Sequence, residues 1–210
     1  MGEAKVLVGV GIATLLILGA GVFLFSRSSS TASVKADPAL LLHSDSNQIA
    51  TASATATLIE FGDYQCPACG SAYPYVKQIL ADFSGKLNFG WRNFPLAQHR
   101  NAQIAAEAAE AAGEQGKYWA MHDLLFTRQA EWSDSDTPLG IFVEYAKSLE
   151  LDPDKFTTAV KDHKYLPKIQ QDTSDGNRLG VNSTPTFFVN GEKVEASLDV
   201  LRAKIEAAAK

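Results

Sequence analysis

Two cysteines three positions apart, Cys66 and Cys69, constrain this chain more than any other feature. They are the only cysteines among its 210 residues. The apolar run Thr57–Phe61 before them predicts a short strand, and helical spacing begins at Gly70. The pair is therefore expected where a strand leads into the first turn of a helix. Free backbone N–H groups and the positive end of the helix dipole stabilise an anion there, which lowers the pKa of a thiol.

The spacing of these cysteines favours redox chemistry over a metal site or a structural clip. A structural zinc site needs four ligands, but there is no second CxxC motif and the four histidines are scattered along the chain. A disulfide between these cysteines closes a very short loop, and short loops restrain the unfolded chain least. We therefore expect a dithiol that cycles with a disulfide, without a metal or a separate cofactor.

An uncharged apolar run from Val6 to Phe25 predicts a membrane anchor. Its 20 residues match the ~30 Å hydrocarbon core of a bilayer, whereas cleaved signal peptides have shorter apolar cores of about 7–15 residues. Residues 1–26 are thus expected to form an uncleaved anchor with a span at about 6–25. Lys5 and Arg27 flank the run on opposite sides, so the distribution of positive charge is nearly even and barely indicates the orientation of the span in the membrane. An isolated CxxC pair suits an oxidising compartment, which predicts a single-pass cell-membrane protein with an extracytoplasmic domain.

The remainder of the chain predicts one domain on a tether. Residues 27–40 begin with a run of small polar residues, which predicts a flexible linker. Residues 41–210 are long enough for one domain with a sizeable core, and a helical insertion is expected at about 100–180. The net charge of −5 comes without a basic stripe, so nucleic acid is not an expected partner.

The periodicity and turn signals predict an α/β fold with a mixed sheet and helices on its faces. Asn190-Gly191 is a strong hairpin-turn signal, and an edge strand is possible within residues 49–57. Thr137, Asp152 and Ser197 are expected to be N-caps of helices. The expected strands are 57–61, 87–94 (alternating apolar and polar), 186–189 and 192–195; the expected helices are 66–82, 102–112, 118–129, one from 138, one from 153, one ending near 179, and 197–209.

Four segments make the chain resemble the DsbA-like branch of the thioredoxin superfamily. The resemblance covers roughly residues 58–209, nearly the whole expected domain. It implies a thioredoxin-like mixed sheet with an inserted helical subdomain, and the activity of a thiol–disulfide oxidoreductase. The segments are IEFGDYQCPAC at 59–69, RNFPL at 92–96, GKYWAMHD at 116–123 and STPTFFVNG at 183–191.

The resemblance implies a role for each residue of the dithiol and its neighbours. Cys66 would be the exposed nucleophile and Cys69 the resolving thiol of a redox disulfide. Pro185 would be a cis proline beside them, presenting the backbone of Thr184 to an extended substrate. The substrate surface is expected to be completed by the two residues between the cysteines, Pro67 and Ala68.

Other side chains near the motif have two possible interpretations. Glu60 either faces outward from its strand or lies beneath the dithiol, where a buried carboxylate relays the proton of Cys69. Tyr64 and Tyr73 either line an apolar substrate surface or pack in the core, and packing is favoured. His99 is expected to be a solvated loop residue.

These features predict a membrane-tethered enzyme that introduces disulfides into exported proteins. Its expected partners are exported proteins with thiols, a quinone-linked thiol oxidase that resets the dithiol, and membrane lipid around the N-terminal helix. One alternative is a disulfide reductase or isomerase fed by a membrane electron donor. Another is a non-catalytic peptide-binding module with the same fold.

Overall fold

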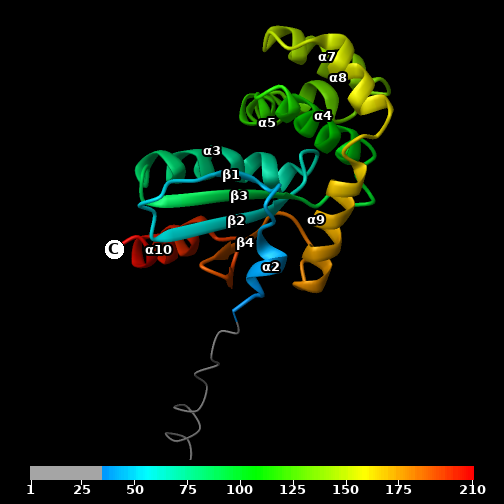
Figure 1. Cartoon of the computed structure of the whole chain (residues 1–210). Coiled ribbons are helices and arrows are strands. Elements are labelled where there is room, and N and C mark those ends of the chain that lie inside the picture. Colours follow the sequence, from blue (N-terminus) through cyan, green and yellow to red (C-terminus); the bar gives the residue numbers. More distant parts are fainter. Residues whose placement is uncertain (1–34) are drawn as a thin grey trace, which may run out of the picture. The chain divides into compact units, whose positions relative to one another are not determined.

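A five-stranded mixed sheet lies at the centre of the fold (Figure 1). The computed structural model describes residues 35–210, which form one compact unit. In the order β1-β3-β2-β4-β5, strands β2 and β3 are parallel and the other neighbours are antiparallel. The strands are β1 Asn47–Ile49, β2 Ala56–Gly62, β3 Leu87–Asn93, β4 Thr186–Val189 and β5 Glu192–Val194.

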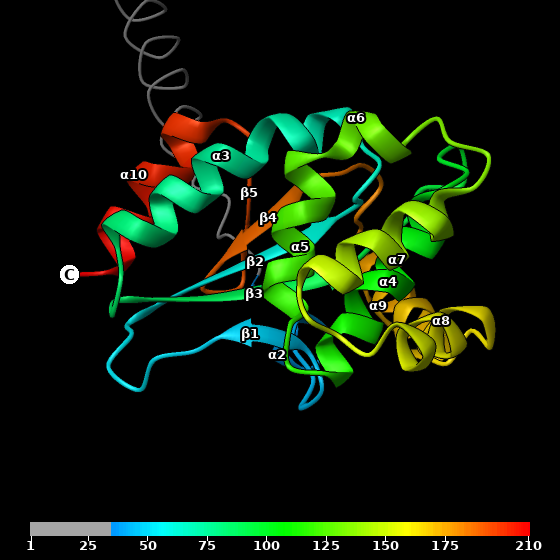
Figure 2. The same ribbon diagram turned by 90° about the horizontal axis from the view of Figure 1, so that it is seen from above.

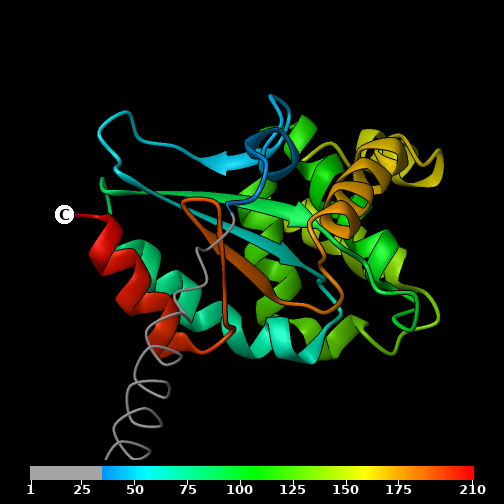
Figure 3. The same ribbon diagram turned by 90° about the horizontal axis from the view of Figure 1, so that it is seen from below.

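Helices cover both faces of the sheet and form the expected insertion. Figure 2 shows α3 and α10 side by side over one face, and Figures 1 and 3 show α2 on the other. Helices α4 to α9 connect β3 to β4 and match the insertion expected at about 100–180. The helices are α2 Pro38–Leu41, α3 Pro67–Asp82, α4 Ala102–Glu114, α5 Tyr118–Thr127, α6 Gln129–Trp132, α7 Pro138–Ser148, α8 Pro153–Lys161, α9 Leu166–Arg178 and α10 Leu198–Ala208.

Strand β2 is buried on both faces because each face meets its own apolar cluster. Leu58 belongs to the cluster beneath α3 and α10, whereas Ile59 and Phe61 pack with Leu41 on the α2 side. Side chains alternate along a strand, so Glu60 points to the same side as Leu58. The strand that leads to the dithiol therefore directs one carboxylate into the core below α3.

Strand β3 alternates in sequence, yet its polar end is not exposed. Arg92 and Asn93 are buried because α9 lies against them and supplies two aspartates. Arg92 donates from Nε to Asp172 Oδ1 at 2.6 Å and from Nη2 to Asp175 Oδ2 at 2.7 Å. The backbone N–H of Asn93 also donates to Asp172, at 3.0 Å. We refer to Arg92, Asn93, Asp172 and Asp175 as the arginine cluster.

Most turns and helix starts follow the sequence signals. Asn190 and Gly191 have φ values of 48° and 85°, the positive pair that a type I′ turn requires. Asp152 caps α8 by accepting from two backbone N–H groups of its first turn. Thr137 and Ser197 occupy N-cap positions, but neither makes a side-chain capping hydrogen bond. The expectation that they cap was therefore right about position and wrong about the contact.

The helix expected over 118–129 is two helices in the structure. Helix α5 ends at Thr127, Arg128 leaves helical geometry with φ −117° and ψ 25°, and α6 starts at Gln129. The break turns α6 toward the start of α3 (Figure 2). The possible edge strand within residues 49–57 does not form there: the edge strand is the short β1, which ends at Ile49 and pairs with β3, and residues 50–55 form no strand.

The expected membrane anchor at 1–26, with its span at about 6–25, lies outside the described residues, as does the linker up to residue 34. None of the helices in residues 35–210 has the length and apolar character that a membrane crossing needs. Helix α2 occupies the last residues that the sequence assigned to the linker.

Candidate active site

The two cysteines lie at the start of α3, directly after the turn that leaves β2. Cys66 is the N-cap residue of α3, and its backbone N–H donates to the carbonyl of Asp63 at 3.1 Å. Both thiols are free and buried. Cys66 is 6% exposed and Cys69 not at all, so Cys66 is the more accessible of the two but not the exposed residue that the resemblance implies. Pro67 and Ala68 are exposed between them. The sequence therefore located the dithiol at the strand-to-helix junction where the structure has it.

A cis proline lies beside Cys66, as the sequence predicts. The Thr184–Pro185 peptide bond is cis. The Sγ of Cys66 donates to the backbone carbonyl oxygen of Thr184 at 3.4 Å, although 118 residues separate the two in sequence. Pro185 is half-buried, and β4 begins at the next residue. The structure thus brings Cys66, Thr184 and Pro185 together on one edge of the sheet.

The two thiols have opposite acidities. A hydrogen bond from Cys69, the side chain of Thr184 and the backbone of Cys69 and Ala68 lower the pKa of Cys66 to about 5, against the opposing effect of its burial. Burial, the hydrogen bond to Cys66 and the charge of Glu60 raise the pKa of Cys69 well above its ordinary value. Cys66 is therefore a thiolate at neutral pH, whereas Cys69 keeps its proton.

The hydroxyl of Thr184 is a fully buried side-chain polar atom with no hydrogen-bond partner among residues 35–210. It lies among the groups that lower the pKa of Cys66. In the thiol state, Cys66 donates to the Thr184 carbonyl, so the hydroxyl is left to donate when Cys66 ionises. The sequence pointed to the backbone of Thr184 and gave no signal for its side chain.

Glu60 is buried at 3% exposure, so the interpretation in which it faces outward is wrong. Within the described part of the chain, its carboxyl has no hydrogen-bond partner, and burial raises its pKa to about 8. A cavity of about 20 Å³ adjoins it, lined also by Tyr73, Lys77, His122 and Asp123. That volume is enough for about one water molecule. Glu60 therefore holds a proton at neutral pH beside a small space that is lined by both apolar and polar side chains.

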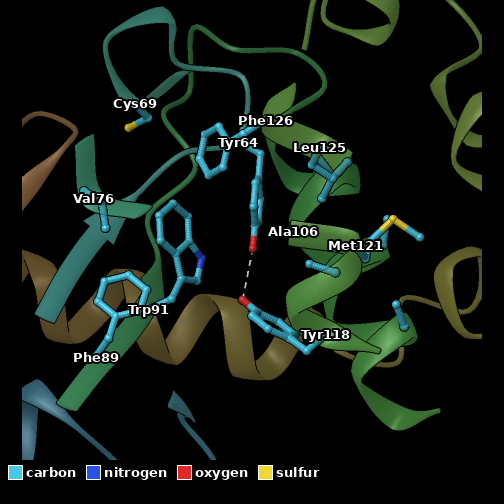
Figure 4. Packing of buried hydrophobic residues seen from close by; sticks show 14 of the residues in the cluster. Tyr64, Cys69, Val76, Phe89, Trp91, Ala106, Tyr118, Met121, Leu125 and Phe126 are labelled. Carbon is cyan, nitrogen blue, oxygen red and sulfur yellow. Dashed lines mark hydrogen bonds between the residues drawn. The ribbon is translucent and has the colours of Figure 1, made fainter. Parts of the chain in front are cut away.

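Aromatic residues from the sheet, from the turn before Cys66 and from α5 of the helical insertion pack together next to this acid. Tyr64 is buried between Trp91 and Phe126, and its hydroxyl contacts that of Tyr118 at 3.1 Å (Figure 4). The same hydroxyl lies 3.0 Å from Nδ1 of His122, whose pKa is lowered by burial to about 3. Tyr64 packs as favoured, and half-buried Tyr73 stacks on Phe126.

His99 is not the solvated loop residue that the sequence predicts. Its Nδ1 lies 2.6 Å from Oδ2 of Asp63, and its side chain is 19% exposed. Asp63 is buried and also accepts from the backbone N–H groups of Gln65 at 2.7 Å and Leu96 at 2.9 Å. Asp63 thereby ties the turn before Cys66 to the loop after β3. Its place three residues before Cys66 was the only sequence signal for this role.

The described residues contain no group of three or more His, Cys, Asp or Glu side chains arranged to hold a metal ion. The site brings together two thiols of unequal acidity, a protonated carboxyl and the backbone of Thr184 before a cis proline. Such a set can exchange thiols with disulfides and move the accompanying proton.

Comparison with solved structures finds the same fold in bacterial redox proteins. Oxidised BdbD from Bacillus subtilis superposes with a TM-score of 0.73 at 23% identity, over 84% of this chain and 98% of that one. The thiol-disulfide exchange protein alpha-DsbA2 from Wolbachia pipientis gives 0.69 at 22% identity, over 80% and 90%. MdbA, a thiol-disulfide oxidoreductase from Corynebacterium diphtheriae, gives 0.65 at 16% identity, over 86% and 97%. At these identities the likeness establishes the fold.

Higher sequence identity is found to parts of much longer proteins. The Na(+)/H(+) antiporter NhaA 1 of Salinispora arenicola is 42% identical over 148 residues, which cover 70% of this chain and 22% of the antiporter. The NhaA 1 of a Mycobacterium species (strain KMS) is 38% identical over 147 residues, covering 68% and 23%. The chain thus spans about a fifth of the length of these curated relatives.

A family model described as thioredoxin matches residues 46–207, which include all five strands and both cysteines. The match agrees with the sheet order, with the CxxC at the start of α3 and with the cis proline before β4. The chain therefore belongs to the thioredoxin family, with the mixed sheet and helical insertion of its DsbA-type members.

Proposed function

We propose that this protein is a membrane-tethered thiol–disulfide oxidoreductase that introduces disulfides into exported proteins. One observation carries the proposal: the Cys66 thiol, with a pKa lowered to about 5, lies 3.4 Å from the backbone carbonyl of Thr184. A reactive sulfur thus stands beside the backbone that precedes the cis proline. An extended polypeptide that pairs with this backbone would bring its own sulfur to Cys66.

The reaction begins with a substrate thiolate attacking Sγ of Cys66 in the disulfide form. The Cys66–Cys69 bond breaks, a mixed disulfide forms between substrate and Cys66, and Cys69 leaves with the electron pair. A second substrate thiolate then attacks the substrate sulfur, and Cys66 leaves as a thiolate. The substrate loses two electrons and gains a disulfide, and the protein is left as the dithiol. Since Cys66 is stable as a thiolate, it is a good leaving group in the second step.

Glu60 supplies the proton that the first step requires. Cys69 leaves as a thiolate in a buried position that strongly disfavours its charge. Glu60 holds a proton at neutral pH and is close enough for its charge to affect the pKa of Cys69. In the reverse direction the same carboxylate takes the proton of Cys69 before it attacks a mixed disulfide.

The low pKa of Cys66 supports the oxidising direction, because stabilising the reduced thiolate makes the disulfide a stronger oxidant. Thioredoxin, at about −270 mV, and DsbA, at about −120 mV, mark the two ends of the scale. Ala68 adds no charge or hydrogen bond of its side chain to the thiolate, so an intermediate potential of about −150 to −220 mV is expected.

Redox state and potential together test this function. Thiol trapping in cells should find the Cys66–Cys69 pair mostly oxidised, and Cys69→Ala should accumulate mixed disulfides through Cys66. Equilibration with glutathione buffers gives the potential. A pair that is mostly reduced, with a potential at or below about −270 mV, would instead indicate a reductase. A disulfide that never turns over would indicate a non-catalytic module.

The proposed setting is the outer side of the cell membrane, with the apolar run at 6–25 as the anchor. A membrane thiol oxidase that passes electrons to quinone would reset the dithiol. A reporter enzyme fused after Lys210 should be active only outside the cytoplasm, and the protein should remain in the membrane fraction after a carbonate wash. Cytoplasmic reporter activity, or a mature protein that begins after Arg27, would contradict the setting.

A further inference from the structure

The turn that carries Cys66 is held by a side chain from the helical insertion. Gln129, the first residue of α6, donates from its Nε2 to two backbone carbonyls of this turn. The distances are 2.7 Å to the oxygen of Tyr64 and 3.0 Å to the oxygen of Cys66. Figure 2 shows α6 beside the start of α3. One amide group thus binds the backbone of the nucleophile and that of the residue two positions before it.

The close approach of Gln129 depends on the absence of a side chain at Gly70. A Cβ at Gly70 would lie 2.6 Å from Oε1 of Gln129. The N–H of Gly70 also donates to the carbonyl of Cys66, at 3.0 Å, so this oxygen accepts from both Gly70 and Gln129. The glycine after the second cysteine therefore makes room for the amide that reaches the first.

Cys66 has no side-chain cap of its own, and its stability as a thiolate depends on surrounding donors. By binding the carbonyls of Tyr64 and Cys66, Gln129 fixes the backbone of the turn that holds Cys66 against the donors that lower its pKa, among them Thr184 and the backbone of Ala68 and Cys69.

We propose that Gln129 is a positioning residue for Cys66, through which the helical insertion sets the reactivity of the nucleophile. The proposal deepens the oxidoreductase function and rests on it. The insertion would then have a chemical task in addition to adding bulk to the fold: it presents one amide to the turn that carries the dithiol.

Other contacts hold this interface together without Gln129. The Nε2 of Gln65 donates to the carbonyl of Ser133 at 2.7 Å, and its Oε1 accepts from the N–H of Asn101 at 2.6 Å. The Nδ2 of Asn101 also donates to the carbonyl of Ser133, at 3.0 Å. Replacing Gln129 should therefore leave α6 docked and change mainly the surroundings of the turn.

The test compares Gln129→Met, which removes the donor, and Gln129→Glu, which also adds charge, in the full chain in detergent. Thiolate absorbance at 240 nm and the rate of iodoacetamide alkylation, each followed against pH, report the ionisation of Cys66. At pH 4, we expect about threefold less thiolate in Gln129→Met and about tenfold less in Gln129→Glu than in the wild type. Gly70→Ala displaces the amide from the other side and should act like Gln129→Met.

Gln115 provides a matched control elsewhere in the insertion. Its Nε2 donates to the carbonyl of Asp152 at 3.2 Å and its Oε1 accepts from the N–H of Asp152 at 2.9 Å, away from the dithiol. Gln115→Glu should leave the ionisation of Cys66 unchanged. The proposal is overturned if Gln129→Met also leaves it unchanged, whatever Gln129→Glu does. A wild-type protein that exchanges no disulfide would instead refute the proposed function.

Discussion

Two of the regions that bury carboxylates in this protein surround them in opposite ways. In the arginine cluster, Arg92 binds both Asp172 and Asp175 at 2.6 and 2.7 Å. Burial alone would raise the pKa of Asp175, but hydrogen bonds from Arg92, Gln171 and His43 hold it below its ordinary value. Beneath the dithiol, Glu60 has no such partner among the described residues, and burial raises its pKa to about 8. In the arginine cluster, hydrogen bonds and the charge of Arg92 thus oppose the effect of burial on the carboxylates. Beneath the dithiol, no described residue opposes the effect of burial on Glu60.

The arginine cluster uses its buried carboxylates for packing, whereas the buried acid beneath the dithiol is suited to proton transfer. A buried ion pair fixes the packing of α9 on β3. Burial raises the pKa of Asp172, and the charge and hydrogen bonds of Arg92 oppose that rise. An uncompensated acid destabilises the fold at neutral pH, yet it can give and take a proton there. The dithiol region also contains the unpartnered hydroxyl of Thr184. Polar groups without partners thus gather where sulfur chemistry is proposed.

The largest expected effect on stability comes from removing the cation of the arginine cluster. Arg92→Met leaves two buried aspartates without their cation, and we expect the free energy of unfolding to fall by about 3–5 kcal/mol. Lys77→Met, which breaks the exposed pair with Asp123 at 2.9 Å, serves as the control and should cost less than about 1 kcal/mol. Urea unfolding measures both. Equal small losses would show that the cluster is not a structural anchor.

Replacing Glu60, the acid without a partner, should change the free energy of unfolding in the opposite direction. The folded-state pKa of Glu60 is raised from 4.5 to about 8, so its stabilising protonated form is fully present below pH 4.5 and is lost as pH rises through 8. Glu60→Gln keeps the neutral form at every pH. We expect it to be more stable than the wild type by about 3 kcal/mol at pH 7, and equal to it at pH 4.

Asp175→Asn is the matched control for this variant, because it makes the same carboxyl-to-amide change in the arginine cluster. It should lower the free energy of unfolding at pH 7, since Arg92 then loses a charged partner. Unfolding experiments at pH 4 and pH 7 measure both variants. If the two variants changed the free energy of unfolding in the same direction at pH 7, the two regions would not differ as described.

The smallest expected effect is at the other unpartnered group. Thr184→Val removes the hydroxyl that lowers the pKa of Cys66, so the reduction potential should fall toward that of thioredoxin by about 10–30 mV. Thr186→Val is the control, because that hydroxyl already donates to the carbonyl of Ser183 at 2.8 Å. Glutathione equilibration measures both. A fall of the same size in Thr186→Val would mean that the Thr184 hydroxyl has no specific role.

Local signals in the sequence were enough to locate the reactive groups. The CxxC motif, the Thr-Pro before a strand and the Asn-Gly turn each depend on a few neighbouring residues, and β4 has the bounds predicted for it. The sequence could not decide the burial of Glu60. A strand covered on both faces loses the alternation that tells inside from outside.

The contacts that distinguish the two regions are long-range, and periodicity gives no sign of them. Arg92 and Asp172 are 80 residues apart, and Gln129 lies 63 residues from Cys66. His99 was expected to be solvated because its partner, Asp63, lies in a distant part of the sequence, in the turn that follows β2. Pairings of this kind are set by how helices dock on the sheet, which a single sequence does not reveal.

The central claim, that Glu60 acts on Cys69 and not on Cys66, has one direct measurement. Reduced protein mixed with an aromatic disulfide releases one coloured thiolate when Cys66 attacks and a second when Cys69 resolves the mixed disulfide, so stopped-flow absorbance separates the two thiols. We predict that Glu60→Gln leaves the first phase within about twofold and slows the second about tenfold or more at pH 7, with loss of its rise near pH 8. Two unchanged phases, or equal slowing of both, would contradict the account.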